Sequence, residues 1–155
     1  MTAQTDSTSP DDKRAWRSWA LYDWANSAFA TTVMAGFFPL FFKAYWADPS
    51  NPSESTYILG LANSIGSIIV AALAPFLGAV ADRAGAKKKF LALFAFLGIV
   101  MTGGLWMVQQ GHWLVAVFVY ALAAIGFSSS NLFYDSLLPV IARKEKVDYV
   151  SALGF

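Results

Sequence analysis

The 155-residue sequence contains no cysteine and one histidine, and charged residues make up only 14% of it. The absence of cysteine excludes a small secreted domain that is held together by disulfides. A formal net charge of +1 argues against a nucleic-acid-binding protein. Because His112 has no cysteine or carboxylate cluster beside it, the sequence predicts no catalytic residue, no metal site and no cofactor, and it disfavours an enzyme.

The few charged residues are unevenly distributed and leave three long uncharged runs. They cover residues 24–42, 55–81 and 90–134, and 57% of the chain is hydrophobic. A helix needs about 20 apolar residues to cross the hydrocarbon core of a bilayer. The first two runs each hold one span, and the third holds two spans separated by the polar residues 109–112. The sequence therefore predicts an all-α polytopic membrane helical bundle, with spans at about 19–45, 56–80, 89–108 and 112–140.

The positions of the basic residues predict how the chain is oriented in the membrane. Of the 11 Lys and Arg residues, 10 lie in the N-terminal segment, in the second loop or after the fourth span, and Lys43 lies at the first loop. Basic loops stay in the cytoplasm, so these three segments are predicted to be cytoplasmic in an integral protein of the cell membrane. All six Trp residues lie near predicted span ends, where their rings prefer the lipid headgroup level.

The two ends of the chain are predicted to differ from the spans. Residues 1–8 are predicted to be a disordered tail before a membrane domain at 9–155. Ser9 is predicted as a helix N-cap, with Asp12 in the first turn. After a cytoplasmic segment at 141–150, an apolar stretch from Ser151 predicts the first turn of a fifth helix that is cut off.

The first predicted span carries one carboxylate, Asp23, one helical turn inside its cytoplasmic boundary. Asn26 and Ser27 follow at i+3 and i+4 and share its face. Carboxylates inside a membrane are costly and face a cavity or a partner, which indicates a proton site or a substrate contact. The alternative, which has equal support, is an acid near a helix start that faces headgroup water or pairs with Arg83 or a Lys.

A second polar face lies on the fourth predicted span, where Ser128, Asn131 and Asp135 are spaced i, i+3 and i+7. The helix rise puts Asp135 at the cytoplasmic side, near the depth of Asp23. The two carboxylates could line one vestibule that opens to the cytoplasm. The alternative is that Ser and Asn hold the helices together, which explains Ser128 and Asn131 better than it explains Asp135. Asn63, on the second span, is also a pathway candidate, but packing explains it better.

The loop between the second and third spans combines small, acidic and basic residues in a fixed order. It reads Gly-x-x-x-Asp-Arg-x-Gly-x-Lys-Lys over residues 78–88. The second glycine permits the backbone conformation that a tight turn can require. Asp82 ends a helix, where an acid opposes the helix dipole, so it is predicted to have a basic partner or a neighbouring helix N-terminus. The motif residues are Gly78, Asp82, Arg83, Gly85, Lys87 and Lys88.

This loop resembles the signature of the major facilitator superfamily, except that Ala86 replaces a usual basic residue. Residues 19–29 (WALYDWANSAF) and 133–139 (FYDSLLP) are similar to the vacuole-effluxer branch of that superfamily. The resemblance covers residues 16–155. It implies a secondary transporter with twelve or more spans in two halves, which works by alternating access.

The same resemblance implies roles for particular parts of the chain. The first and fourth spans would line the substrate cavity, and Asp82 and Arg83 would act in gating at the cytoplasmic side. An amino acid or another small solute is the implied substrate, and proton coupling is the implied energy source.

The number of spans affects the functional prediction. Four spans are fewer than this superfamily has, so we expect the N-terminal part of a longer carrier, which needs the lipid bilayer and the missing C-terminal half as partners. The alternative is a stand-alone four-helix membrane protein that acts as a dimeric small exporter or interaction module. Such exporters use a membrane-embedded Glu in the first helix, and the two glutamates here, Glu54 and Glu145, lie outside the spans.

Overall fold

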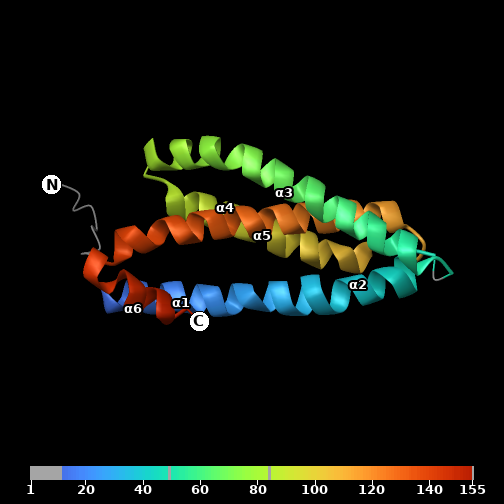
Figure 1. Ribbon diagram of the computed structural model, residues 1–155, viewed down its shortest axis with the longest axis horizontal. Coiled ribbons are helices and arrows are strands. Elements are labelled where there is room, and N and C mark those ends of the chain that lie inside the picture. The colour runs from blue at the N-terminus through green and yellow to red at the C-terminus, as the bar shows by residue number, and fades with distance from the viewer. Residues whose placement is uncertain (1–11, 49, 84, 155) are drawn as a thin grey trace.

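The uncharged runs fold as long helices in the computed structural model, which describes residues 12–48, 50–83 and 85–154. Four helical segments are long and apolar enough to cross a membrane: Lys13–Trp46, Pro52–Asp82, Lys87–Met107 and Trp113–Ile141. The fold is therefore the all-α bundle that the sequence predicts (Figure 1). The tail predicted at residues 1–8 lies outside the described residues.

The first helical segment begins with α1, Lys13–Ala28. Asp12 is its N-cap, and the Asp12 carboxylate accepts a hydrogen bond from the backbone N–H of Arg14 at 2.9 Å. The prediction that Asp12 lies in the first turn is wrong, because its backbone is extended. Ser9, the predicted N-cap, lies outside the described residues.

The same segment continues beyond α1 without a break to Trp46. Two wide π-helical stretches, Phe29–Phe37 and Phe42–Trp46, flank the short helix α2, Phe38–Phe41. Pro39 lies in α2 and cannot donate a backbone hydrogen bond to the preceding turn. The regular α-helical pattern is therefore interrupted near the middle of the segment.

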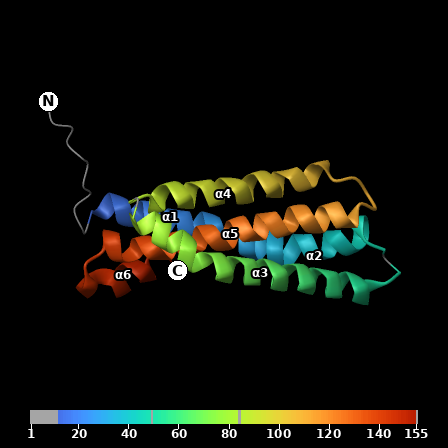
Figure 2. The ribbon, with the colours of Figure 1, turned by 90° about the horizontal axis from the view of Figure 1, so that it is seen from above.

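Three more long helices complete the bundle, with α5 at its centre. They are α3, Pro52–Arg83; α4, Lys87–Gly104, which a 3₁₀ turn extends to Met107; and α5, Trp113–Ile141. Helix α5 packs most extensively against α4 and then against α3, and the α1–α2 segment runs along it on another side (Figure 2). This arrangement brings the first and fourth predicted spans together.

A short helix, α6, follows α5 after a 3₁₀ turn and comprises Val147–Ala152. It begins four residues before Ser151, the predicted start of a fifth helix. The chain reverses after α5, so α6 lies beside the N-terminal part of α1 (Figure 1). Helix α6 therefore covers one end of the contact between α1 and α5.

Aromatic clusters close the bundle at both of its ends. At the α2 end, Phe38 stacks on Tyr120 with ring centroids 3.8 Å apart, beside the buried Phe42. At the α6 end, the buried residues are Trp16, Trp19, Tyr134, Ile141, Ala142 and Val150. Asn26 of α1 and Asn131 of α5 lie between the two clusters, whereas Asp23 and Asp135 lie beside the cluster at the α6 end.

Three of the six Trp residues lie inside the protein rather than facing lipid headgroups. Trp16, Trp19 and Trp46 are each less than a tenth exposed. Their indole N–H groups donate to the backbone carbonyls of Ile141, Tyr134 and Val108, respectively, at 2.9, 3.3 and 3.1 Å. These bonds tie the first helical segment to distant parts of the chain.

Candidate functional site

The polar faces predicted on the first and fourth spans meet in the structure. The side-chain amide of Asn26 on α1 donates a hydrogen bond to the amide oxygen of Asn131 on α5. Both side chains are partly buried. This contact is a side-chain hydrogen bond that joins α1 directly to α5.

Asp23 precedes Asn26 by about one helical turn and Asp135 follows Asn131 by one turn, so on these antiparallel helices the two carboxylates lie at the same end of the contact. Asp23 is half-buried, whereas Asp135 is exposed. In the described part of the chain, neither forms an ion pair with a basic side chain. The structure therefore brings together Asp23, Asn26, Asn131 and Asp135 from the two predicted faces.

Other predicted pathway residues lie apart from this group. Ser27 is exposed, and Ser128 is partly buried without lining the cavity described below. Asn63 on α3 accepts a hydrogen bond from the Tyr120 hydroxyl at 3.3 Å, which joins α3 to α5 away from Asn26. Asn63 therefore has the geometry of a helix-packing residue.

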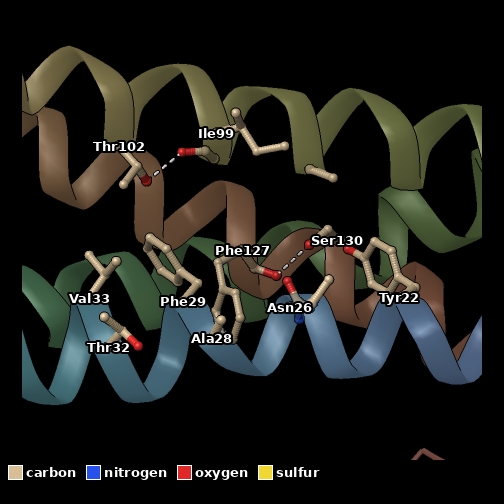
Figure 3. A pocket seen from close by; sticks show the side chains of 13 residues that line it. Tyr22, Asn26, Ala28, Phe29, Thr32, Val33, Ile99, Thr102, Phe127 and Ser130 are labelled. Carbon is tan, nitrogen blue, oxygen red and sulfur yellow. Dashed lines mark hydrogen bonds between the residues drawn. The ribbon is translucent and has the colours of Figure 1, made fainter.

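A cavity of about 550 Å³ lies between α1, α4 and α5. Its walls are mostly apolar, with Phe29, Val33 and Phe127 among them. Figure 3 shows how the polar side chains at this cavity lie. These polar residues are Tyr22, Asn26, Thr32, Thr102 and Ser130.

Sequence reasoning missed several residues of this region. Tyr22 and Ser130 line the cavity, and in Figure 3 the Tyr22 hydroxyl points toward Ser130. Tyr134 is 5% exposed and stacks on Trp19 and Tyr22. Tyr22 and Tyr134 immediately precede Asp23 and Asp135 in the sequence. This Tyr-Asp pair, repeated in both spans, could have identified the two tyrosines as site residues.

The loop motif forms a compact turn between α3 and α4. Gly85 has a φ of +57°, and the backbone N–H of Ala86 donates to the Ala81 carbonyl at 2.9 Å. The Asp82 carboxylate pairs with the Lys87 ammonium at 2.7 Å, so the predicted basic partner of Asp82 is a loop lysine. Lys87 also donates to the Ser136 carbonyl at 3.4 Å, which connects the loop to α5.

The remaining motif residues make fewer contacts. A Cβ atom added at Gly78 would meet nothing within 4 Å. Lys88 is exposed and lines a second groove beside Trp19, Tyr22 and Tyr134. The side chain of Arg83 lies outside the described part of the structure.

The chain is similar to one family of proteins and to individual proteins from bacteria and fungi. The model of a family described as vacuole effluxer Atg22 like matches residues 51–151. An uncharacterized MFS-type transporter, YxiO, from Bacillus subtilis is 42% identical over 139 residues, which are 89% of this chain and 32% of that protein. The autophagy-related protein 22 of Coccidioides immitis is 24% identical, over 90% of this chain and 30% of that protein.

The length of these relatives differs from that of the chain. An uncharacterized protein from Aquifex aeolicus is 29% identical, over 88% of this chain and 33% of that protein. The chain thus spans about a third of the length of the curated relatives that it matches. No solved structure matches it.

Proposed function

This chain belongs to the vacuole effluxer Atg22-like family, and on that premise we propose that it is the N-terminal part of a secondary transporter. The carrier moves a small solute across a membrane by alternating access. The resemblance to the major facilitator superfamily, predicted from the loop motif and from residues 19–29 and 133–139, is confirmed by the family match and by the MFS-type relative.

The observation that carries the proposal is the Asn26–Asn131 contact at the edge of an apolar cavity. Binding sites for small molecules are mostly apolar, with a few polar groups that orient the ligand, and have volumes of roughly 300–1,000 Å³. The cavity here, about 550 Å³, has that size and lining. Its polar groups are uncharged, which suits a small solute with hydrogen-bonding groups. An amino acid, the solute that the family resemblance of residues 19–29 and 133–139 implies, is the substrate that we propose.

The loop motif is the part that we propose as a gate. The Asp82–Lys87 ion pair and the Lys87–Ser136 bond join α3, α4 and α5 at one end of the bundle. Movement of α5 relative to α4 would strain or break these bonds. They therefore favour one arrangement of the helices over another.

Neutralising the two carboxylates tests the transport function. We expect Asp23→Asn and Asp135→Asn to impair transport of radiolabelled amino acids by the intact carrier in vesicles by at least tenfold, because each removes a charge from the polar pathway. Membrane insertion of the variants should persist. Glu145→Gln is the matched control, since Glu145 is an exposed acid in the turn between α5 and α6. Normal transport by both Asp variants would leave Asp23 and Asp135 as boundary residues only.

A further inference from the structure

The second groove, which Lys88 lines, lies where the starts of α1 and α4 meet the end of α5, at the α6 end of the bundle (Figure 1). Its volume is about 520 Å³, similar to that of the cavity between α1, α4 and α5. Of the described residues, Tyr22 is the one that lines both. Neither the proposed solute pathway nor the proposed gate uses this groove.

The lining of the second groove changes from charged to apolar along its length. Arg14 and Lys88 line it from the first turns of α1 and α4. Eight residues, or about 12 Å along a helix, separate Arg14 from Tyr22, the lining residue of α1 that lies deepest in the bundle. The groove is therefore amphipathic, with two cations at one end and a wall of large side chains beyond them. That wall consists of Trp19, Tyr22, Leu91, Tyr134, Leu137 and Ile141.

The charged end of the groove has a net positive charge. Arg14 and Lys88 are exposed, and in the described part of the chain neither side chain forms an ion pair. Asp12 also lines the groove, but its carboxylate accepts the backbone N–H of Arg14 and caps α1. The neighbouring Arg17 and Lys89 are exposed as well and add positive charge around the entrance. This end of the groove therefore suits an anionic group.

The starts of α1 and α4 have basic residues where a helix favours acidic ones. The N-terminus of a helix has a partial positive charge, so an anion stabilises it and a cation does not. Among the described residues, neither helix has an acid in its first turn, and no side chain caps α4. Arg14 and Lys88 are each the second residue of their helix. An anion bound between them would offset the repulsion at both helix ends.

A phospholipid with an anionic headgroup matches both parts of the groove. The Arg14 guanidinium can bind two phosphate oxygens at once, and the Lys88 ammonium adds a second positive charge. A small soluble anion would leave the apolar wall uncovered, and an uncharged apolar molecule would leave the two cations without a partner. Basic pockets between transmembrane helices on the cytoplasmic side are known to hold anionic headgroups. The starts of α1 and α4 are predicted to lie on that side.

We propose that the second groove binds an anionic phospholipid of the surrounding membrane, with Arg14 and Lys88 as the ligands of its phosphate. The glycerol and the first part of the acyl chains lie against the apolar wall. Helices α1 and α4 each pack on α5, so the lipid connects them across the groove. The inference does not depend on the proposed transport function, because lipid binding is measured without a solute.

The affinity of the purified intact carrier for single lipids tests this site. Native mass spectrometry in detergent measures binding of phosphatidylglycerol, which is anionic, and of phosphatidylcholine, which has no net charge. We expect the wild-type carrier to bind phosphatidylglycerol more tightly. Arg14→Gln and Lys88→Gln should each lower that affinity about fivefold, the effect of one cation beside an anionic headgroup, and should leave binding of phosphatidylcholine almost unchanged.

Two neighbouring cations provide matched controls. Arg17 on α1 and Lys89 on α4 are exposed and belong to the same helices, but they do not line the groove. Arg17→Gln and Lys89→Gln should therefore keep the wild-type affinity for phosphatidylglycerol. Equal losses in all four variants would mean that the basic surface attracts anionic lipid without a site, which would overturn the proposal. Equal affinity of the wild-type carrier for the two lipids would also overturn it and would leave the groove to another segment of the carrier.

Three further measurements separate a lipid site from the alternatives. Ser18 is exposed and lines the groove, so Ser18→Phe narrows it without a change of charge and should weaken binding of phosphatidylglycerol. Lys88→Arg keeps the charge and should bind like the wild type. If it lost affinity as Lys88→Gln does, the loss would be structural and the site would be refuted. Displacement of the lipid by glycerol 3-phosphate would show a site for soluble anions and would equally refute a lipid site.

Discussion

At the scale of the single residue, two glycines of the loop motif differ in whether their backbone conformation requires glycine. Gly85 has a φ of +57°, in the left-handed region that side chains with a Cβ disfavour by about 1–2 kcal/mol. Gly78 lies inside α3, and a Cβ there would meet nothing within 4 Å. Only one of the two positions therefore needs glycine for its backbone.

We expect Gly85→Ala to lower the free energy of unfolding by about 1–2 kcal/mol. The matched change Gly78→Ala should raise it by about 0.5–1 kcal/mol, because alanine loses less backbone entropy in a helix. Unfolding in mixed micelles, followed by tryptophan fluorescence, measures both. Equal losses in the two variants would show that the motif glycines serve a purpose other than backbone geometry.

The residues of the site were predictable only in part. Asp23, Asn26, Asn131 and Asp135 could be found because a polar residue in an apolar run is conspicuous and helical spacing assigns it to a face. Tyr134 could not, because an aromatic residue in such a run is expected in any membrane helix. Its contacts with Trp19, Tyr22 and Gly154 are set by the packing of α1 and α6 and not by local sequence.

At the scale of the element, a close glycine contact joins α4 to α5. A Cβ added at Gly126 would lie 2.7 Å from the backbone nitrogen of Gly98 and 2.8 Å from the Phe94 carbonyl oxygen. Such close backbone approach is how membrane helices gain packing contacts without a hydrophobic driving force. The most extensive helix pair in the bundle thus depends on one missing methyl group.

Gly126→Ala is expected to destabilise the bundle by about 1–3 kcal/mol, because the backbones of α4 and α5 must separate to admit the methyl group. Gly103→Ala is the control on α4, where a Cβ would meet nothing within 4 Å. The same micelle unfolding assay compares them. If both variants unfolded alike, the α4–α5 contact would have to be looser than the structure has it.

Helix positions were easier to predict than the way the helices end. Charges and the polar residues 109–112 limit the uncharged runs, so the approximate range of each long helix follows from hydropathy alone. The start of α6 at Val147 did not follow, because a six-residue helix has too few residues to show a pattern and forms by packing on α1. The N-cap at Asp12 did not follow from the sequence either, because Ser9 and Pro10 also fit the pattern of an N-cap and a first helical residue.

At the scale of the whole molecule, large apolar side chains are left exposed over much of the surface. Trp24 is 76% exposed, Phe76 is 71% and Ile99 is 70%. Monomeric soluble proteins rarely expose apolar surface on this scale, whereas lipid or further transmembrane helices would cover it. Since the relatives are about three times as long as this chain, both kinds of cover fit the proposed carrier.

The orientation that the charges predict for the bundle can be tested directly, because the chain has no cysteine. We propose that the N-terminus, the loop motif and the turn before α6 face the cytoplasm. Gln110→Cys, in the exposed loop between α4 and α5, should react with a membrane-impermeant maleimide in intact cells. Lys144→Cys, which is also exposed, should react only after the cells are opened.

The reverse labelling pattern would invert the proposed orientation and also affect the mechanism. Asp23 and Asp135 lie toward the α6 end of the bundle, so the orientation decides which compartment these two carboxylates face. With Lys144 in the cytoplasm, we expect Asp23, Asp135 and the Asp82–Lys87 pair to face that same compartment. With Lys144 outside, the same residues would sample the opposite compartment, and the proposed gate would close the other entrance.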